Sequence, residues 1–317
     1  MIRTFKLARH TIQEVADTDH ALDARLSQAT WIDAHEPSED EREALNAFLA
    51  DELPATDDVE EIESSARYFT DADGIHVHSL FLSQSEGRHG TTTVAFILQP
   101  ERLITFRDGD LADFRLLRMR ARRGQIEASS AQELMLTIFE QKVENLADSV
   151  EDMHRKLENV SHLVLEDPDA DLEEAIDQLA QLEDSNGKIR LCLMDTQRAV
   201  SFLQRHLRDH GQLQETGREV MRDVDTLMSH IAFLFDKINF LMDSTQGFIN
   251  IEQNQIIKIF SIAAVVFLPP TMSASIYGMN FNVMPELSWS FGYPFALGLM
   301  VLSGISPYLY FKHKGWL

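Results

Sequence analysis

Two long stretches without a charged side chain close the sequence, and they restrict the possible folds more than any other feature. No Asp, Glu, Lys or Arg occurs between Lys258 and Glu286 or between Glu286 and Lys312, gaps of 27 and 25 residues. Each gap contains the roughly 20 residues that a helix needs to cross a bilayer. A pair of buried core helices is the alternative. Aromatic residues at the edges of the runs, such as Trp289 and Tyr308, are typical of interfacial belts and favour two membrane spans.

The lysines predict the orientation of these spans. Lys258 precedes the first span, Lys312 and Lys314 follow the second, and the connecting loop has no positive charge. By the positive-inside rule, both ends of the hairpin face the cytoplasm and the loop lies outside. Residues 1–10 contain no long apolar core, so we expect no signal peptide there.

Charge is distributed unevenly along the 317 residues, whose formal net charge is −23. From Asn254 onward the sequence has three lysines and one glutamate, a net charge of +2. The residues before Asn254 therefore carry −25. So acidic a surface argues against nucleic acid as a partner and suits divalent cations. The basic run 115–123 is expected to pair with acidic helices. The single cysteine, Cys192, excludes an internal disulfide and a Cys-based zinc site.

The sequence lacks the usual signatures of ATP binding and of nucleophilic catalysis. It has no Gly-x-x-x-x-Gly-Lys-Ser/Thr loop, so ATP is not implied. It has no local Ser/His/Asp or Cys/His signature of a known enzyme family either. We therefore expect a protein that is not an enzyme.

Hydrophobic patterning predicts an α/β domain followed by helices. Short β-rich runs occur at 31–33, 66–70, 75–82, 91–98 and 103–106. Ser38 and Glu41 have capping-box spacing and predict a helix start, and from Ala131 the pattern is helical. The predicted organisation is a cytoplasmic α/β (or α+β) domain (1–130), a helical region with a long stalk helix (131–253), a pore-lining span (254–277), an outer loop (278–290), a second span (291–311) and a basic cytoplasmic tail (312–317).

A heptad seam marks the predicted stalk helix. Its apolar positions, separated alternately by four and three residues, are Val220, Val224, Leu227, Ile231, Leu234, Ile238 and Leu241. One helix is predicted from about Gln212 to the Pro269–Pro270 pair, roughly 90 Å at 1.5 Å per residue. A helix so long must bury its seam against partners. Packing within one chain is one explanation; continuity with a membrane span favours parallel copies around an axis.

The same spacing continues into the first span. Asn254, Ser261, Leu268 and Ser275 are seven residues apart, and Thr271 lies near the same stripe. These polar groups either pack helices together and bond to the backbone, or they line a narrow pore of neutral oxygens and apolar rings. Only symmetry-related copies can build such a pore, because two spans cannot enclose a channel. No carboxylate lies within either span, so direct metal coordination is not expected there.

The residues after the first span carry a resemblance to a known family. They read Tyr277-Gly278-Met279-Asn280 and then Met284-Pro285-Glu286-Leu287. This resembles the CorA family of magnesium transporters, whose signature is Gly-Met-Asn at the outer end of the first of two C-terminal spans. The resemblance implies a homopentamer with a cytoplasmic funnel in a bacterial inner membrane. It also implies Mg²⁺ as both transported and regulatory ion, with Co²⁺ and Ni²⁺ as further ions.

The resemblance also implies roles for individual residues. Gly278, Met279 and Asn280 would form the selectivity filter, with Asn280 as a ring at the outer mouth. Asn254, Leu268 and Thr271 fall at family pore positions, and Phe260 would belong to a hydrophobic constriction. Glu286 would attract cations to the mouth, or is an ordinary solvated acid.

Elementary chemistry agrees with a neutral filter. Mg²⁺ gives up its six waters reluctantly, so uncharged oxygens can bind the hydrated ion without stripping it. A ring of carboxylates would hold the ion more tightly and slow its exit.

In this hypothesis, the membrane potential drives the inward movement of Mg²⁺. A doubly charged ion moving inward gains about 4.6 kcal/mol per 100 mV. In the family, Mg²⁺ bound between cytoplasmic domains closes the channel, and Asp223 sits where the family places a stalk acid at the subunit interface. An acid on a solvated helix face is the alternative for Asp223. Its partner acid is not identified from the sequence.

Two rival functions stay open at this point. One is a zinc transporter of the related ZntB type, a subgroup that commonly has Ile where Met279 stands. The other is a membrane-anchored coiled-coil sensor or scaffold that transports nothing.

Overall fold

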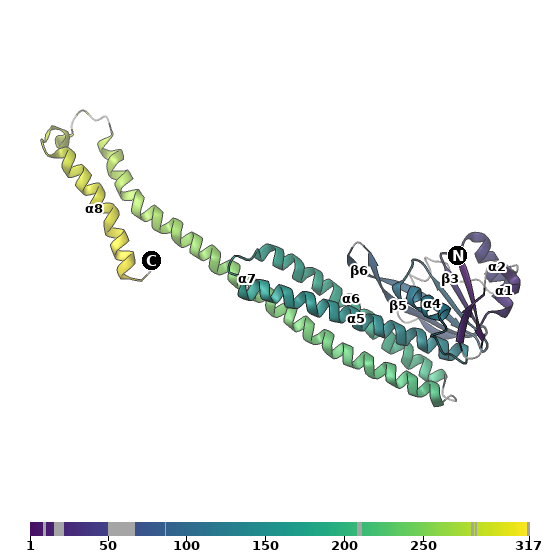
Figure 1. The fold of residues 1–317 in the computed structure, drawn as a ribbon. Coiled ribbons are helices and arrows are strands. Elements are labelled where there is room, and N and C mark those ends of the chain that lie inside the picture. Colours follow the sequence, from purple (N-terminus) through teal and green to yellow (C-terminus); the bar gives the residue numbers. More distant parts are fainter. Residues whose placement is uncertain are drawn as a thin grey trace. The chain divides into compact units, whose positions relative to one another are not determined.

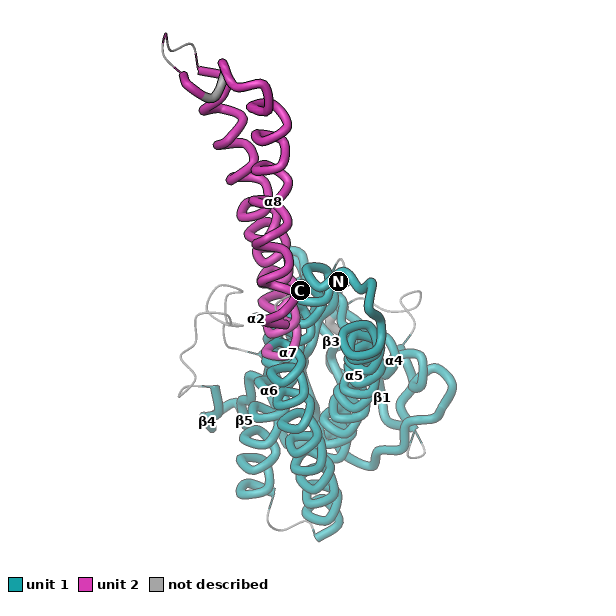
Figure 2. Tube along the Cα trace, turned by 90° about the vertical axis from the view of Figure 1, so that its left-hand side faces the viewer, with its two compact units in different colours: residues 1–242 teal, residues 243–317 magenta. Residues whose placement is uncertain are grey.

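A computed structural model describes residues 1–8, 11–15, 22–49, 67–85, 87–207, 211–279, 282 and 284–315. The chain divides into two compact units, Met1–Met242 and Asp243–Leu317, and the boundary falls inside helix α7 (Figure 2).

A seven-stranded sheet forms the first part of unit 1, with the order β2-β1-β3-β7-β6-β5-β4. Its strands are β1 (Ile2–Ala8), β2 (Thr11–Glu14), β3 (Trp31–His35), β4 (Tyr68–Thr70), β5 (Ile75–Ser85), β6 (Arg88–Leu98) and β7 (Leu103–Arg107). The central pair β3–β7 is parallel, and the other neighbours are antiparallel. The predicted strands correspond to β3–β7, with residue 66 outside the described residues. The strands β1 and β2 and the helix α1 (Leu22–Gln28) were not predicted.

Both faces of the sheet are covered, as the alternation of side chains along a strand requires. Ile32 and Ala34 of β3 point into a core shared with α1 and α2 (Glu39–Leu49). Trp31 belongs to the core on the opposite face. The predicted capping box at the start of α2 is confirmed: the Glu41 N–H donates to Ser38 Oγ at 3.3 Å, and the Ser38 N–H donates to Glu41 Oε2 at 2.9 Å.

The second face of the sheet packs on long helices (Figure 1). These are α4 (Ala112–Arg122), α5 (Ala131–Glu166) and α6 (Leu172–His206). The first part of α7 (Gly211–Tyr277) contributes to the same apolar core. The start of α5 at Ala131 agrees with the predicted change to a helical pattern. Ser130 caps it by accepting the Glu133 N–H at 3.1 Å.

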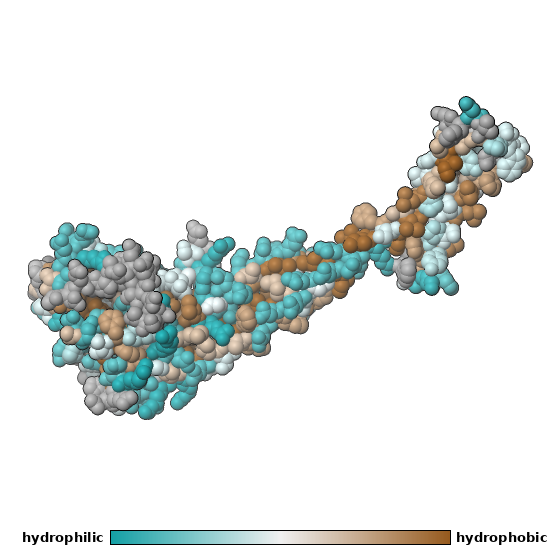
Figure 3. Space-filling view, turned by 180° about the vertical axis from the view of Figure 1, so that it is seen from behind, coloured by the Kyte–Doolittle hydropathy of each residue, from teal (hydrophilic) through white to brown (hydrophobic). Residues whose placement is uncertain are grey.

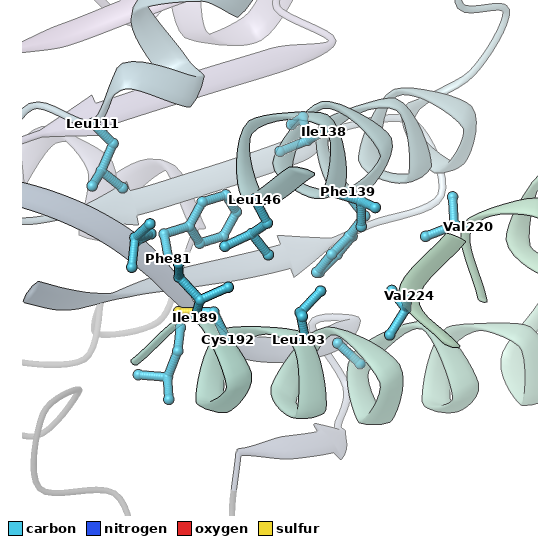
Figure 4. Packing of buried hydrophobic residues seen from close by; sticks show 14 of the residues in the cluster. Phe81, Leu111, Ile138, Phe139, Leu146, Ile189, Cys192, Leu193, Val220 and Val224 are labelled. Carbon is cyan, nitrogen blue, oxygen red and sulfur yellow. The ribbon is translucent and has the colours of Figure 1, made fainter. Parts of the chain in front are cut away.

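The heptad seam of α7 is buried within the chain itself. Six of its seven residues are at most 2% exposed, and Leu227 is partly buried against the same core. Figure 4 shows Phe139 of α5, Leu193 of α6 and Val224 of α7 directed into one cluster. The expectation that parallel copies bury this seam is therefore wrong. The apolar faces of α5 and α6 already cover it.

A buried polar hub joins the sheet to these helices. The Asp195 carboxylate of α6 accepts hydrogen bonds from Tyr68 Oη (2.6 Å), Ser79 Oγ (2.5 Å) and the Leu80 N–H (2.8 Å). Lys142 of α5 is 1% exposed, with its Nζ 3.6 Å from the same carboxylate and 2.9 Å from Ser79 Oγ. Burial lowers the pKa of Lys142, and the negative charge of Asp195 opposes that shift.

Helix α7 continues beyond the predicted end at the proline pair, through Pro269 and Pro270 to Tyr277. Each proline removes one backbone donor. Ser and Thr hydroxyls and a neighbouring helix make such interruptions tolerable in apolar surroundings. The Ser273 hydroxyl donates to the Pro269 carbonyl at 3.1 Å, and α8 (Gly292–His313) lies against this level of α7.

Burial of the α7 seam within one chain predicts that a buried seam residue contributes more to stability than an exposed leucine. Leu234→Ala should lower the free energy of unfolding by about 2–5 kcal/mol, because it leaves a cavity in a well-packed core. Leu191→Ala, at a leucine of α6 that is 48% exposed, should change it by less than about 0.5 kcal/mol. Denaturant unfolding followed by circular dichroism measures both. Equal effects of the two substitutions would contradict the intrachain packing.

Candidate functional site

The candidate site lies on the two C-terminal helices. Both contain a stretch long and apolar enough to cross a membrane, and none of the α7 stretch and only 6% of the α8 stretch is buried. Figure 3 shows exposed apolar side chains along this part of the chain. Core helices of a soluble protein would be mostly buried, so the structure argues against that alternative.

One side of α7 contacts α8 at very short range. A Cβ added at Gly304 of α8 would lie 3.3 Å from Pro270 Cγ and 3.5 Å from the Val266 carbonyl oxygen. Nearer the C-terminal end of α7, Ala274 and Tyr277 line a pocket together with Met300 of α8 and other residues. The residues 266, 270, 274 and 277 therefore define the α8-facing side of α7.

Most of the predicted stripe occupies the opposite side of α7. Successive residues are about 100° apart around a helix, which places Asn254, Ser261, Leu268 and Ser275 within about 40° of the direction opposite the α8-facing side, whereas Thr271 and Phe260 lie about 75° and 95° from that direction. The five residues of the predicted stripe, together with Phe260 of the implied hydrophobic constriction, are all exposed in the single chain. The side chains of Phe260 and Leu268 are 71% and 64% exposed. Each α7 thus offers neutral oxygens and apolar groups on a face that its own α8 does not cover.

Hydrogen bonding within the helix orients one of these oxygens. The Thr271 hydroxyl donates to the Phe267 carbonyl at 2.7 Å. Its only proton is then engaged, so its oxygen presents acceptor lone pairs to its surroundings. Ser261 also lines an apolar pocket of about 460 Å³ with Phe311 of α8 and Gly315, so α8 approaches the stripe at this one level.

At the outer end, α7 stops within the predicted filter sequence. The Gly278 N–H donates to the Ala274 carbonyl at 2.9 Å, and a Cβ at Gly278 would lie 3.2 Å from that oxygen. Glycine permits this close approach. Met279 is 47% exposed. Asn280 lies outside the described residues, and of Glu286 only the backbone is described, within the 3-10 helix η1 (Pro285–Ser288).

The predicted regulatory residue, Asp223, is exposed on α7 in unit 1. It lies near Glu140 of α5 and Glu219 of α7. Partial burial, followed by the negative charges of Glu144, Glu219 and Asp223, raises the pKa of Glu140. These acidic neighbours were missed from the sequence, although the four-residue spacings 140/144 and 219/223 were available as a signal.

The acidic neighbours do not form a complete metal site in one chain. Among the described residues, no group of three or more His, Cys, Asp or Glu side chains is arranged to hold a metal ion. The described residues around Asp223 therefore offer no complete set of ligands for a divalent ion.

Comparisons with known proteins agree with this architecture. The family model for CorA-like Mg²⁺ transporter proteins matches residues 27–313. The chain is 48% identical to the magnesium transport protein CorA of Salmonella typhimurium over 321 residues, covering 100% of both chains. It is 51% identical to CorA of Escherichia coli K12 over 294 residues, covering 92% of this chain and 93% of that protein.

Solved structures share the fold. The CorA magnesium transporter of Methanocaldococcus jannaschii superposes with a TM-score of 0.77 at 17% identity, covering 100% of this chain and 99% of that one. The full-length CmaX protein gives 0.72 at 16% identity, with coverage of 100% and 98%. The predicted fold class, an N-terminal sheet domain with a long helix and C-terminal apolar helices, is confirmed. The pentamer stays a prediction.

The close contact of α8 with α7 can be tested with two glycines of the same helix. Gly304→Leu should destabilise the protein by about 1–3 kcal/mol, since the side chain enters space held by Pro270 and the Val266 carbonyl. Gly298→Leu should be tolerated, because a Cβ there meets nothing within 4 Å. Thermal unfolding of the detergent-solubilised protein measures the difference. A melting temperature unaltered by Gly304→Leu would refute the contact.

Proposed function

The chain belongs to the family of CorA-like Mg²⁺ transporter proteins, and on this premise we propose that it is a voltage-driven homopentameric channel for Mg²⁺ uptake. Membership of this family makes it a membrane transporter and confirms that it is not an enzyme. Co²⁺ and Ni²⁺ are proposed as further permeant ions. The observation that carries the proposal is the stripe of neutral oxygens and apolar side chains on the side of α7 opposite α8.

Several copies are needed to make this stripe a pathway. One α7 and one α8 cannot enclose a channel, and the stripe lacks cover from its own α8. Five copies of α7 around an axis would turn each stripe residue into a ring, with α8 outside against lipid. Such rings expose polar groups to water in the pore instead of to hydrocarbon, where they are costly.

The ring of Asn280 is the proposed selectivity filter. Five side-chain amides can accept hydrogen bonds from the waters that surround Mg²⁺, and the ion keeps its tightly held first shell. Gly278 admits the tight end of α7 below the filter, and Met279 is proposed to pack behind it. Glu286 in the outer loop would raise the local concentration of cations by its charge.

Below the filter, polar and apolar rings alternate. Ser275, Thr271, Ser261 and Asn254 would offer uncharged oxygens to the hydrated ion. Leu268 and Phe260 would form the narrow hydrophobic rings, which can close a pore by excluding water. Neutral oxygens bind weakly enough for the ion to leave, which a conduit requires.

The membrane potential is the proposed energy source. Inward movement of Mg²⁺ gains about 4.6 kcal/mol per 100 mV, so no ATP is required. The proposed location is the bacterial inner membrane, with both termini cytoplasmic. Lys258 before the first span, together with Lys312 and Lys314 after the second, supports this orientation.

Closure by cytoplasmic Mg²⁺ is proposed to act through the acidic surface of unit 1. Asp223, with Glu140 and Glu219 near it, is the proposed regulatory position. Mg²⁺ between subunits would neutralise mutual repulsion and hold the closed state. When cytoplasmic Mg²⁺ falls, repulsion returns and the equilibrium shifts toward the open state.

The filter hypothesis is tested by two asparagines in the same loop. Asn280→Ala should abolish selective Mg²⁺ uptake into proteoliposomes under an inside-negative potential, because the ring of amides is lost. Asn282→Ala, two residues further on, should leave uptake close to that of the wild type. Native mass spectrometry should give a pentamer for all three proteins. Wild-type uptake by Asn280→Ala would refute the filter.

The same flux assay separates the rival functions. A zinc transporter of the ZntB type would prefer Zn²⁺ and depend on a proton gradient. A membrane-anchored scaffold would show no ion flux at all. Either result for the wild type would overturn the proposed function.

The regulatory role of Asp223 is tested by its charge. Asp223→Asn should shift closure to several-fold higher internal Mg²⁺, because it removes one negative charge per subunit. Asp225→Asn is the matched control, since Asp225 accepts a hydrogen bond from Gln197 of its own chain at 2.9 Å. Mg²⁺ uptake is recorded against Mg²⁺ preloaded into the vesicles. Identical inhibition curves for wild type and Asp223→Asn would remove this residue from the gate.

A further inference from the structure

Positive charge is concentrated in one pocket of unit 1, although the chain as a whole carries −23. The pocket has a volume of about 410 Å³, within the range of small-ligand sites. It is lined by Arg3, Arg115, Arg118, Met119, Arg122 and Arg123. Arg3 comes from β1, and the others belong to α4 or directly follow it. The fold thus brings five guanidinium groups from two elements to one wall.

Asp110 neutralises only part of this charge. It accepts hydrogen bonds from Arg115 at 2.7 Å and from Arg118 at 3.1 Å. Partial burial alone would raise the pKa of Asp110, but these two hydrogen bonds and the two positive charges lower it. The carboxylate is therefore ionised and shared between two arginines.

Glu14 of β2 is shared in the same way. It accepts from Arg122 Nε at 2.6 Å and lies 3.5 Å from Arg3. Arg123 forms no ion pair with any described residue, and its side chain is exposed. Asp33, 3.4 Å from Arg118, is already bound by the buried Arg107. Among the described residues, Asp110 and Glu14, together with the Asp33 that Arg107 already binds, thus serve four guanidinium groups, and Arg123 pairs with none of them.

Within the part of the chain that the structure describes, the expected pairing of this basic run with acidic helices occurs at one position. Arg120, outside the pocket, lies 3.3 Å from Glu144 of α5. The arginines that line the pocket instead pair with Asp110, Glu14 and Asp33. Each guanidinium has five donors in a planar fork, so most donors on this wall are left for a ligand. Clustered like charges also repel one another until an anion enters.

We propose that this pocket binds a soluble anion with several phosphate groups, of the class of inorganic polyphosphates and nucleoside triphosphates. Phosphate oxygens match the guanidinium fork and accept two parallel hydrogen bonds from it. A chain of phosphates can engage several arginines at once, which a single carboxylate or chloride cannot do. The pocket residues belong to unit 1, whereas the residues of the proposed ion pathway belong to unit 2.

The test measures binding of tripolyphosphate and of ATP to the full-length protein in detergent, without Mg²⁺, by isothermal titration calorimetry at low salt. The pocket variant is Arg115→Gln with Arg123→Gln, both at exposed side chains. The matched control is Arg155→Gln with Arg218→Gln, whose side chains are 74% and 61% exposed on α5 and α7. Both variants change the net charge equally. Thermal unfolding checks that each is folded.

The wild type and the control should bind tripolyphosphate alike, and the pocket variant should bind at least about tenfold more weakly, since charge-assisted hydrogen bonds are lost. Equal weakening in both variants would reveal a general charge effect and overturn the proposal. So would absence of binding to the wild type.

Experiments on the same three proteins also distinguish two other occupants of the arginine pocket. Binding only to vesicles that carry phosphorylated inositol lipids, with no binding of soluble polyphosphate, would assign the pocket to a headgroup and overturn the soluble ligand. Loss of oligomer mass in the pocket variant, together with no tripolyphosphate binding by the wild type, would assign the arginines to acidic side chains of a second copy. That result would also overturn the proposal.

Discussion

The contact between Gly304 and the Val266–Pro270 turn determines which side of α7 is left for other partners. In apolar surroundings helices associate through close packing and interhelical hydrogen bonds, and small residues allow their backbones to approach. With one side of α7 held against α8, most of the stripe residues are turned away from it, although Ser261 lines a pocket with Phe311 of α8. The assignment of a pathway to these residues rests on that division of the helix surface.

A heptad repeat has two different uses along the same helix. In unit 1 the seam from Val220 to Leu241 is covered by α5 and α6 of the same chain. In unit 2 the stripe from Asn254 to Ser275 mixes polar and apolar residues and stays uncovered. The first pattern stabilises one subunit. The second pattern is suited to rings built from several subunits, because its polar side chains require hydrogen-bond partners, either water or the same side chains of neighbouring subunits.

Much of this architecture was predictable because it depends on local sequence. The charge-free stretches, the capping box at Ser38 and the helix start at Ala131 need only neighbouring residues. The strand β1 was missed because its lysine and arginine interrupt the apolar alternation, and only pairing with β3 reveals it. The partner of the α7 seam was predicted wrongly, since a heptad repeat specifies an apolar face and not the molecule that covers it. The hub at Asp195 joins residues more than 100 positions apart, which no local pattern encodes. In the candidate site, five stripe positions followed from spacing and Phe260 from the family resemblance alone, whereas the acids around Asp223 needed the approach of α5 to α7.

The proline pair has a mechanical consequence for α7. Pro269 and Pro270 withdraw two adjacent amide donors from a helix that is otherwise continuously bonded. Bending stiffness is lowest where the backbone bonds are missing, so a force transmitted along the helix produces its largest deflection at this level. Leu268 and Thr271 flank this pair of prolines. A small tilt there moves an apolar side chain and a hydroxyl together, so the helix carries a built-in joint beside two of the residues proposed to set the width of the pathway.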